Sequence, residues 1–252
     1  MDQRIEQQDT VNGGSSRRKF LQSSTTAAVG TALGAKFAAP AVLSAAPSTQ
    51  TLRVGMVGCG GRGAGAALNA LAADDDVALT AMADLFEDNL HNSLTQLQTH
   101  APEKVRVESE RCYLGFDAYR RLLESDVDVV ILATPPAFRA DQYAAAIEAG
   151  KHCFVEITAA VDAPGVRTVL KASDEAEERG LSVVSGFCWR YHPGLRAFKE
   201  QLSAGAIGDI RTVYATYYRN SLGHKYHGER TPQMGDLEWQ IRDWYPYLWL
   251  SG

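Results

Sequence analysis

The stretch Leu52-Arg53-Val54-Gly55-Met56-Val57-Gly58-Cys59-Gly60-Gly61-Arg62-Gly63 decides the fold of this chain. It is a short apolar run that ends in a glycine-rich loop, and an alanine-rich segment with few polar residues, 64–72, follows it. A glycine-rich loop alone is a weak signal, because glycine turns are common. A buried strand before the loop and a helix after it make the pattern typical of a turn that holds the pyrophosphate of a dinucleotide.

A second apolar run, 77–83, ends in Asp84. An acid at the end of the second strand is placed to bind the hydroxyls of the adenosine ribose. The residues after Asp84 are Leu85 and Phe86 rather than basic ones, which favours NAD over NADP, although Arg62 can still reach a phosphate. The alternative is a plain glycine turn in another kind of α/β domain.

Each glycine of the loop has an expected role. Gly58 allows the tight turn from strand to helix, Gly60 lets backbone amides approach the pyrophosphate, and Gly63 lets the helix lie close to the strand. The amino end of the helix then faces the anion.

Apolar runs and amphipathic segments alternate along the rest of the chain, which predicts an α/β fold of the Rossmann type, a doubly wound parallel sheet. Its ligand belongs at the carboxyl ends of the strands. We expect the further strands at 105–107, 127–133, 152–155 and 181–184, and the helices at 64–72, 87–97, 116–123, 140–149 and 162–179.

The first 46 residues have the form of a twin-arginine signal peptide. Arg17 and Arg18 stand just before an uncharged, mildly apolar stretch, 20–35, and small residues follow it. This predicts a periplasmic or otherwise extracytoplasmic protein with no stable membrane span after processing, and a nucleotide bound tightly before export. A disordered basic tail is the alternative.

Composition excludes some functions. The 252 residues carry a net charge of −5 and no clustered basic face, which argues against nucleic acid as a partner. The four cysteines form no Cys-x-x-Cys pair, and His224 and His227 have no identifiable third ligand, so no metal site is expected.

The chain resembles the glucose–fructose oxidoreductase and inositol dehydrogenase family, Gfo/Idh/MocA, in the strings VGMVGCGGRG, DLFED, FDAYRRLL, DVVILATPP, AAIEAGKH, FVE and LSAGAIGDI. The resemblance implies a sugar or polyol substrate and a homo-oligomer. It also implies a nucleotide-binding domain at 50–187 and, at 188–252, an incomplete α+β domain for substrate and oligomer contacts. The implied cofactor residues are Gly58, Gly60, Arg62 and Gly63 at the pyrophosphate, Asp84 at the adenosine ribose, and Thr134, Pro135 and Glu156 on the nicotinamide side.

Two features depart from the family pattern. Most members follow the glutamate with Lys-Pro, whereas this chain has Ile157 and Thr158, and isoleucine cannot move a proton. Residues 209–219 read as the first strand of the second domain, and the chain stops where the segment with the family's catalytic histidine is expected. The nearby candidates for a base are Tyr191 and His192.

Three functions follow. The first is an NAD(P)-binding oxidoreductase whose ancestral reaction is hydride transfer between nicotinamide and a sugar or polyol. The second is an NAD-dependent glycosidase of the same fold, and the third is a catalytically inactive, truncated nucleotide-binding protein. The fold alone does not separate them.

Overall fold

A computed structural model describes residues 50–218 and 229–252, which fall within one unit of the chain, Pro47–Gly252. The expected twin-arginine signal and the His224–His227 pair lie outside the described residues. Within the described ranges, no helix is both long and apolar enough to cross a membrane.

A six-stranded, wholly parallel sheet forms the centre of the fold, with the order β3-β2-β1-β4-β5-β6. This order reverses between β1 and β4, which creates a crevice at the carboxyl ends of these two strands. The doubly wound prediction is therefore confirmed. The strands are β1 Leu52–Val57, β2 Val77–Asp84, β3 Cys112–Leu114, β4 Val129–Leu132, β5 His152–Val155 and β6 Val183–Ser185.

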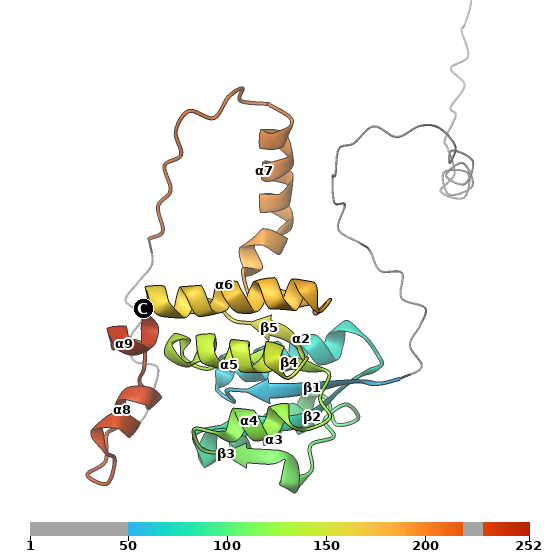
Figure 1. Ribbon diagram of the computed structural model, residues 1–252, viewed down its shortest axis with the longest axis vertical. Coiled ribbons are helices and arrows are strands. Elements are labelled where there is room, and N and C mark those ends of the chain that lie inside the picture. The colour runs from blue at the N-terminus through green and yellow to red at the C-terminus, as the bar shows by residue number, and fades with distance from the viewer. Residues whose placement is uncertain (1–49, 219–228) are drawn as a thin grey trace, which may run out of the picture. The chain divides into compact units, whose positions relative to one another are not determined.

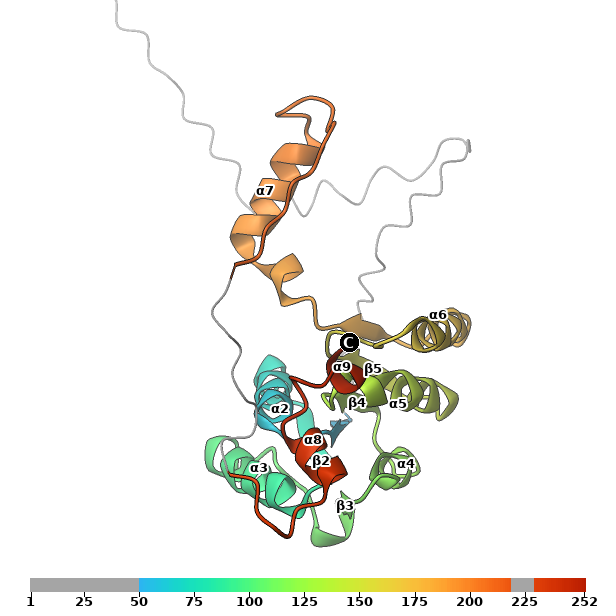
Figure 2. The ribbon, with the colours of Figure 1, turned by 90° about the vertical axis from the view of Figure 1, so that its left-hand side faces the viewer.

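Helices cover both faces of the sheet (Figure 2). On one face α2 and α3 pack against buried side chains such as Met56 and Leu79, and on the other α4, α5 and α6 pack against Val57 and Val130. Successive side chains of a strand point to opposite faces, so Met56 and Val57 belong to different cores. The helices are α2 Gly61–Ala73, α3 Glu87–His100, α4 Ala118–Leu123, α5 Pro136–Glu148 and α6 Ala163–Glu178.

The turn from β1 to α2 depends on two glycines. Gly58 has φ of +91°, and a Cβ there would lie 2.7 Å from the Thr134 amide nitrogen at the end of β4. A Cβ on Gly63 would overlap the carbonyl oxygen of Gly58. Only glycine lets α2 start directly above β1 at this distance, as the sequence predicted.

The third strand is not where the sequence placed it. Residues 105–107 form a single bridge, in which Val105 lies opposite Leu79, and the third strand is instead Cys112–Leu114. The backbone hydrogen bonds of this first contact stop at Arg106, and the chain pairs again with the carboxyl-terminal half of β2 only after a short 3-10 turn, Ser109–Arg111. The Val-x-Val pattern at 105–107 therefore corresponds to a single bridge to β2 and not to a strand.

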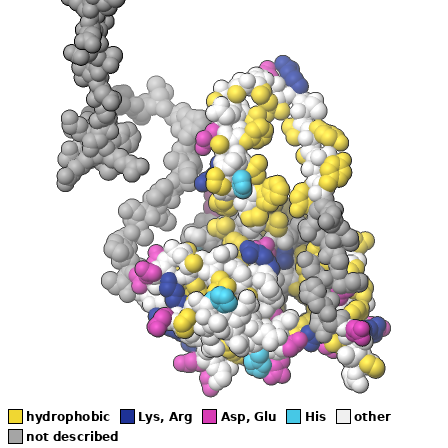
Figure 3. Space-filling view, turned by 180° about the vertical axis from the view of Figure 1, so that it is seen from behind, with side chains coloured by type: hydrophobic (Ala, Val, Ile, Leu, Met, Phe, Trp, Pro, Cys, Tyr) yellow, Lys and Arg dark blue, Asp and Glu magenta, His cyan; other side chains and the backbone are white. Residues whose placement is uncertain are grey.

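The expected strand at 209–219 was also wrong in the part that the structure describes. Residues 209–218 are irregular, because no described strand lies beside them to pair with their backbone. They follow a 3-10 turn, Cys188–Tyr191, and helix α7, Pro193–Ser203. Figure 3 shows hydrophobic side chains gathered over α7 and this stretch, and Tyr214 is 88% exposed.

The carboxyl-terminal segment, 229–252, packs against the α/β domain. It contains two short helices, α8 Asp236–Arg242 and α9 Leu248–Ser251, at the end of the sheet toward which β1 points (Figure 1). Leu250 is fully buried, and α9 contacts α5. This segment therefore lies beside the crevice.

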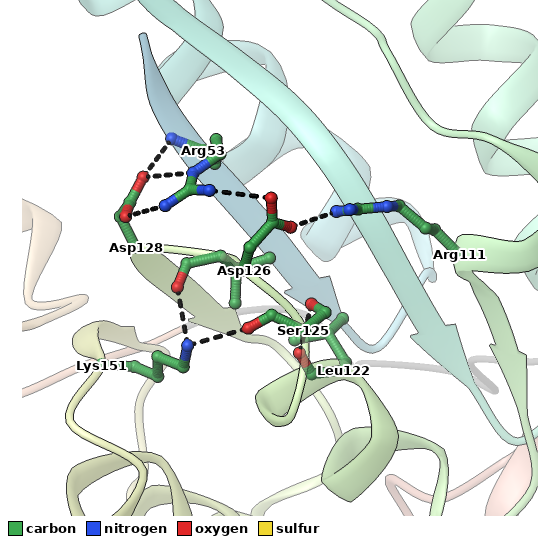
Figure 4. A network of polar contacts seen from close by, with 8 residues as sticks. Arg53, Arg111, Leu122, Ser125, Asp126, Asp128 and Lys151 are labelled. Carbon is green, nitrogen blue, oxygen red and sulfur yellow. Dashed lines mark hydrogen bonds and ion pairs between the residues drawn. The ribbon is translucent and has the colours of Figure 1, made fainter. Parts of the chain in front are cut away.

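A polar network ties the amino end of β1 to the turn before β4 (Figure 4). The backbone N–H, Nε and Nη2 of Arg53 donate to Asp128 at 2.8–3.0 Å, and its Nη1 donates to Asp126 at 2.8 Å. Arg111 also contacts Asp126, and Lys151 donates to the carbonyl oxygens of Ser125 and Val127, both at 2.9 Å. Hydrogen bonds from Arg53 lower the pKa of Asp128, and those from Arg111 lower the pKa of Asp126.

We expect Gly63→Ala to lower the free energy of unfolding by about 3 kcal/mol or more, because the new methyl overlaps the Gly58 carbonyl. The control is Gly65→Ala, two residues along the same helix, where the methyl has room and should stabilise the fold by about 0.5–1 kcal/mol. Urea unfolding measures both. Equal stability of the two variants would contradict the close contact.

The lowered pKa of Asp128 predicts an acid-sensitive contribution to stability. This contribution to stability is fully present above the pKa of Asp128 in the unfolded chain, about 3.9, and is lost as the pH falls through its lower pKa in the folded protein. Asp128→Asn should therefore lower the urea midpoint near neutral pH and flatten its decline from about pH 5 to about pH 3. Asp117→Asn, at a side chain that is 87% exposed, is the control, and an equal effect there would contradict the prediction.

Candidate functional site

A cleft of about 670 Å³ lies at the carboxyl ends of the central strands. The loops after β1, β2, β4 and β5 supply its walls, and so does the segment 241–244. Of the cofactor residues predicted from the sequence, all but Gly63 line this cleft, and Gly63 is buried beneath the turn. The lining residues are Gly58, Gly60, Arg62, Asp84, Thr134, Pro135 and Glu156.

The floor of the cleft suits an anion. Helix α2 begins at Gly61, so its first backbone N–H groups lack partners within the helix and carry a partial positive charge. A Cβ on Gly60 would meet no atom within 4 Å, which means that the backbone here is open to a ligand. This is the geometry that a pyrophosphate requires.

Asp84 is oriented by the backbone around it. Its Oδ2 accepts a hydrogen bond from the Cys59 N–H at 2.6 Å, and its Oδ1 accepts one from the Phe86 N–H at 2.8 Å. Burial raises the pKa of Asp84, and these two donors oppose that shift. The Asn89 side chain and the Leu85 N–H also donate to this carboxylate, which fixes its orientation in the cleft.

An ion pair joins the first turn of α2 to the loop after β5. The Nε and Nη2 atoms of Arg62 lie 2.7 and 2.6 Å from Oε1 of Glu156, whose side chain is 8% exposed. The sequence placed both residues at the cofactor, but it did not predict that they bind each other.

Arg139 also lines the cleft, and the sequence analysis did not predict it as a site residue. It is buried on α5 and donates to the carbonyl oxygens of Glu156 at 3.2 Å and Thr158 at 2.8 Å, so it holds the backbone that carries Glu156. Burial lowers the pKa of Arg139 to about 10. An arginine within the apolar segment after Pro135 and Pro136 was the available signal.

The part of the cleft beside β4 and β5 combines polar and apolar side chains. Thr134 donates its hydroxyl to Oε1 of Gln142 at 2.6 Å, and Pro135 precedes the first residue of α5. Ile157 lines the cleft and is 42% exposed, so an apolar side chain stands where the family pattern has lysine. Tyr191 and His192, the candidates for a base, are exposed and do not line this cleft.

Metal ligands do not gather in the described part of the chain, where no group of three His, Cys, Asp or Glu side chains is placed to hold an ion. Cys59, Cys112, Cys153 and Cys188 are all free thiols.

Comparison with known proteins supports this geometry. The model of an oxidoreductase family with an NAD-binding Rossmann fold, Gfo/Idh/MocA, matches residues 52–185. A dTDP-3,4-didehydro-2,6-dideoxy-α-D-glucose 3-reductase of Streptomyces violaceoruber is 30% identical over 173 residues, which are 68% of this chain and 45% of the reductase. A glycosyl hydrolase family 109 protein of Shewanella sp. strain MR-4 is 32% identical over 245 residues, 91% of this chain and 48% of that protein.

Among solved structures, a 3-ketoreductase from Actinomadura kijaniata in complex with NADP and TDP-benzene superimposes with a TM-score of 0.50 at 29% identity. The match covers 64% of this chain and 45% of the ketoreductase. The chain thus spans about half the length of the curated relatives it matches.

The open backbone at Gly60 and the oriented carboxylate of Asp84 fit a dinucleotide, and the cofactor is NAD or NADP. Sequence, strand order and site geometry agree. The chain belongs to the Gfo/Idh/MocA oxidoreductase family, and its NAD-binding Rossmann domain includes residues 52–185.

Proposed function

We propose that this chain is the nucleotide-binding part of an oxidoreductase that transfers hydride between nicotinamide and a sugar or polyol. The observation that carries the proposal is the cleft, where an open helix start and an oriented acid lie at the two places that a dinucleotide needs. The relation to a deoxysugar reductase supports a carbohydrate as the substrate class.

The residues divide the work of binding. Gly58, Gly60 and the start of α2 cradle the pyrophosphate, and Arg62 adds a cation beside it. Asp84 holds the adenosine ribose, while Thr134, Pro135 and Glu156 border the nicotinamide. When bound, the nicotinamide supplies hydride chemistry, and the protein supplies position and charge.

Proton transfer needs a group that neither Ile157 nor Arg139 supplies. Ile157 cannot donate or accept a proton, and Arg139 is committed to backbone carbonyls. Tyr191 and His192 remain the candidates of the described chain for this role. Their exposed positions require a substrate that extends from the cleft toward them.

A second function is an NAD-dependent glycosidase. Two observations favour it, the match to glycosyl hydrolase family 109 proteins over 91% of this chain and the apolar Ile157 at the lysine position. Release of a sugar without net formation of NADH identifies a glycosidase, whereas NADH formed in proportion to oxidised sugar identifies a dehydrogenase. A chain that binds nucleotide but does neither supports the inactive form.

We also propose that the chain is exported by the twin-arginine route and forms a homo-oligomer. The order of Arg17, Arg18 and the apolar stretch 20–35 supports export, and the exposed aromatic side chains near Tyr214 support association. Replacing both arginines by lysine should retain the protein in the cytoplasm, as fractionation of cells would show. Unchanged export would contradict the proposal.

Nucleotide binding tests the proposed function directly. Calorimetry with the full chain should show binding of NAD or NADP, and Gly60→Ala should weaken it at least about tenfold, or about 1.4 kcal/mol, because its methyl enters the space of the pyrophosphate. Thermal stability should not change. Gly65→Ala, outside the cleft, is the matched control, and binding of neither nucleotide by the unaltered chain would refute the function.

A further inference from the structure

The carboxyl-terminal segment forms one wall of the cleft at the end of β2. Ile241, Arg242 and Trp244 line it together with Phe86, although they lie outside the family match at 52–185. The guanidinium carbon of Arg242 lies 3.9 Å from the centre of the Phe86 ring, within the range of a cation–π contact. A residue distant in sequence therefore lies beside the loop that follows Asp84.

Two carboxylates hold Arg242 in this wall. Its Nη1 and Nη2 atoms donate to the two oxygens of Asp88 at 2.9 and 3.2 Å, and its Nε donates to Glu238 at 3.0 Å. The Arg242 side chain is only 12% exposed. Partial burial acts to raise the pKa of Asp88, but the hydrogen bonds from Arg242 keep this pKa below its ordinary value. Asp88 is therefore charged near neutral pH.

The charges at this end of the cleft decide which nucleotide it accepts. Asp84, Asp88 and Glu238 set three carboxylates against the single guanidinium of Arg242. NADP differs from NAD by a phosphate on the adenosine ribose, next to the hydroxyls that an acid at the end of the second strand binds. This phosphate carries close to two negative charges near neutral pH. A cation that is already paired does little to offset its repulsion by the acids.

The other arginines that line the cleft also have partners. Arg62 pairs with Glu156 across the cleft, and Arg139 donates to backbone carbonyls. Among the residues that line the cleft, Arg242 is the cation that lies beside the loop after β2. It is therefore the cation to consider for a phosphate on the adenosine ribose.

We propose that Asp88 and Glu238 hold Arg242 away from the ribose phosphate and thereby make this site selective for NAD over NADP. Arg242 is then a specificity-determining residue supplied by the carboxyl-terminal segment. This inference rests on the proposed function, because it needs a dinucleotide in the cleft.

The test compares the dissociation constants of NAD and NADP for the full chain and for Asp88→Asn. Neutralising Asp88 removes one of the two carboxylates that hold Arg242 and lets its Nη atoms turn toward the phosphate, so the affinity for NADP relative to NAD should rise about tenfold, or about 1.4 kcal/mol. In Asp88→Asn with Arg242→Gln, the gain should vanish. A structural role of the ion pair would not produce this reversal.

Glu87→Gln is the matched control. Glu87 is the neighbouring acid in the first turn of α3, its side chain is 70% exposed, and its change removes the same charge one residue earlier in the chain. It should leave the ratio of affinities unchanged. If Asp88→Asn does not fold, Glu238→Gln should shift the ratio in the same direction, because it releases Nε of Arg242.

The outcomes separate the two proposals. If the unaltered chain binds neither nucleotide, the proposed function fails and takes this inference with it. If the unaltered chain binds NADP as tightly as NAD, or if Asp88→Asn leaves the ratio unchanged, only the inference is overturned. A shift of equal size in Glu87→Gln would also overturn it, because net charge alone would then explain the choice.

Discussion

The contact of Gly63 with the carbonyl group of Gly58 limits how closely α2 approaches β1. With no Cβ in the way, the first turn of α2 starts directly above the carboxyl end of β1 and turns its free amides toward the crevice. The register of β1 with β2 and β4 then places Asp84 and Thr134 on either side of this turn. The arrangement of the site thus depends on the absence of one methyl group.

The fold was largely readable from residues with strong local signals. The runs that end at Val57 and Ala83 consist mostly of apolar residues, and burial on both faces of the sheet requires this. The short strand Cys112–Leu114 has no such run, because it lies at the edge of the sheet and pairs with β2 alone. Residues 209–218 have the composition of a strand, but a strand also needs a neighbour.

The site was predictable where it comes from loops that directly follow strands, because topology brings such loops to one edge. Gly58, Asp84 and Glu156 belong to this group. Arg242 could not be found in this way, because packing of a distant segment, anchored by the buried Leu250, brings it to the cleft. No motif or spacing in the sequence indicates that this segment packs beside the cleft.

The ion pair between Arg62 and Glu156 gives the cleft an internal counterion. A pyrophosphate that recruits Arg62 must take it from a carboxylate, so that binding exchanges one anionic partner for another. Such an exchange gains less from long-range attraction than the filling of an uncompensated cationic pocket. Recognition at the pyrophosphate end of the cleft thus depends less on the charge of Arg62 than the presence of an arginine alone would suggest.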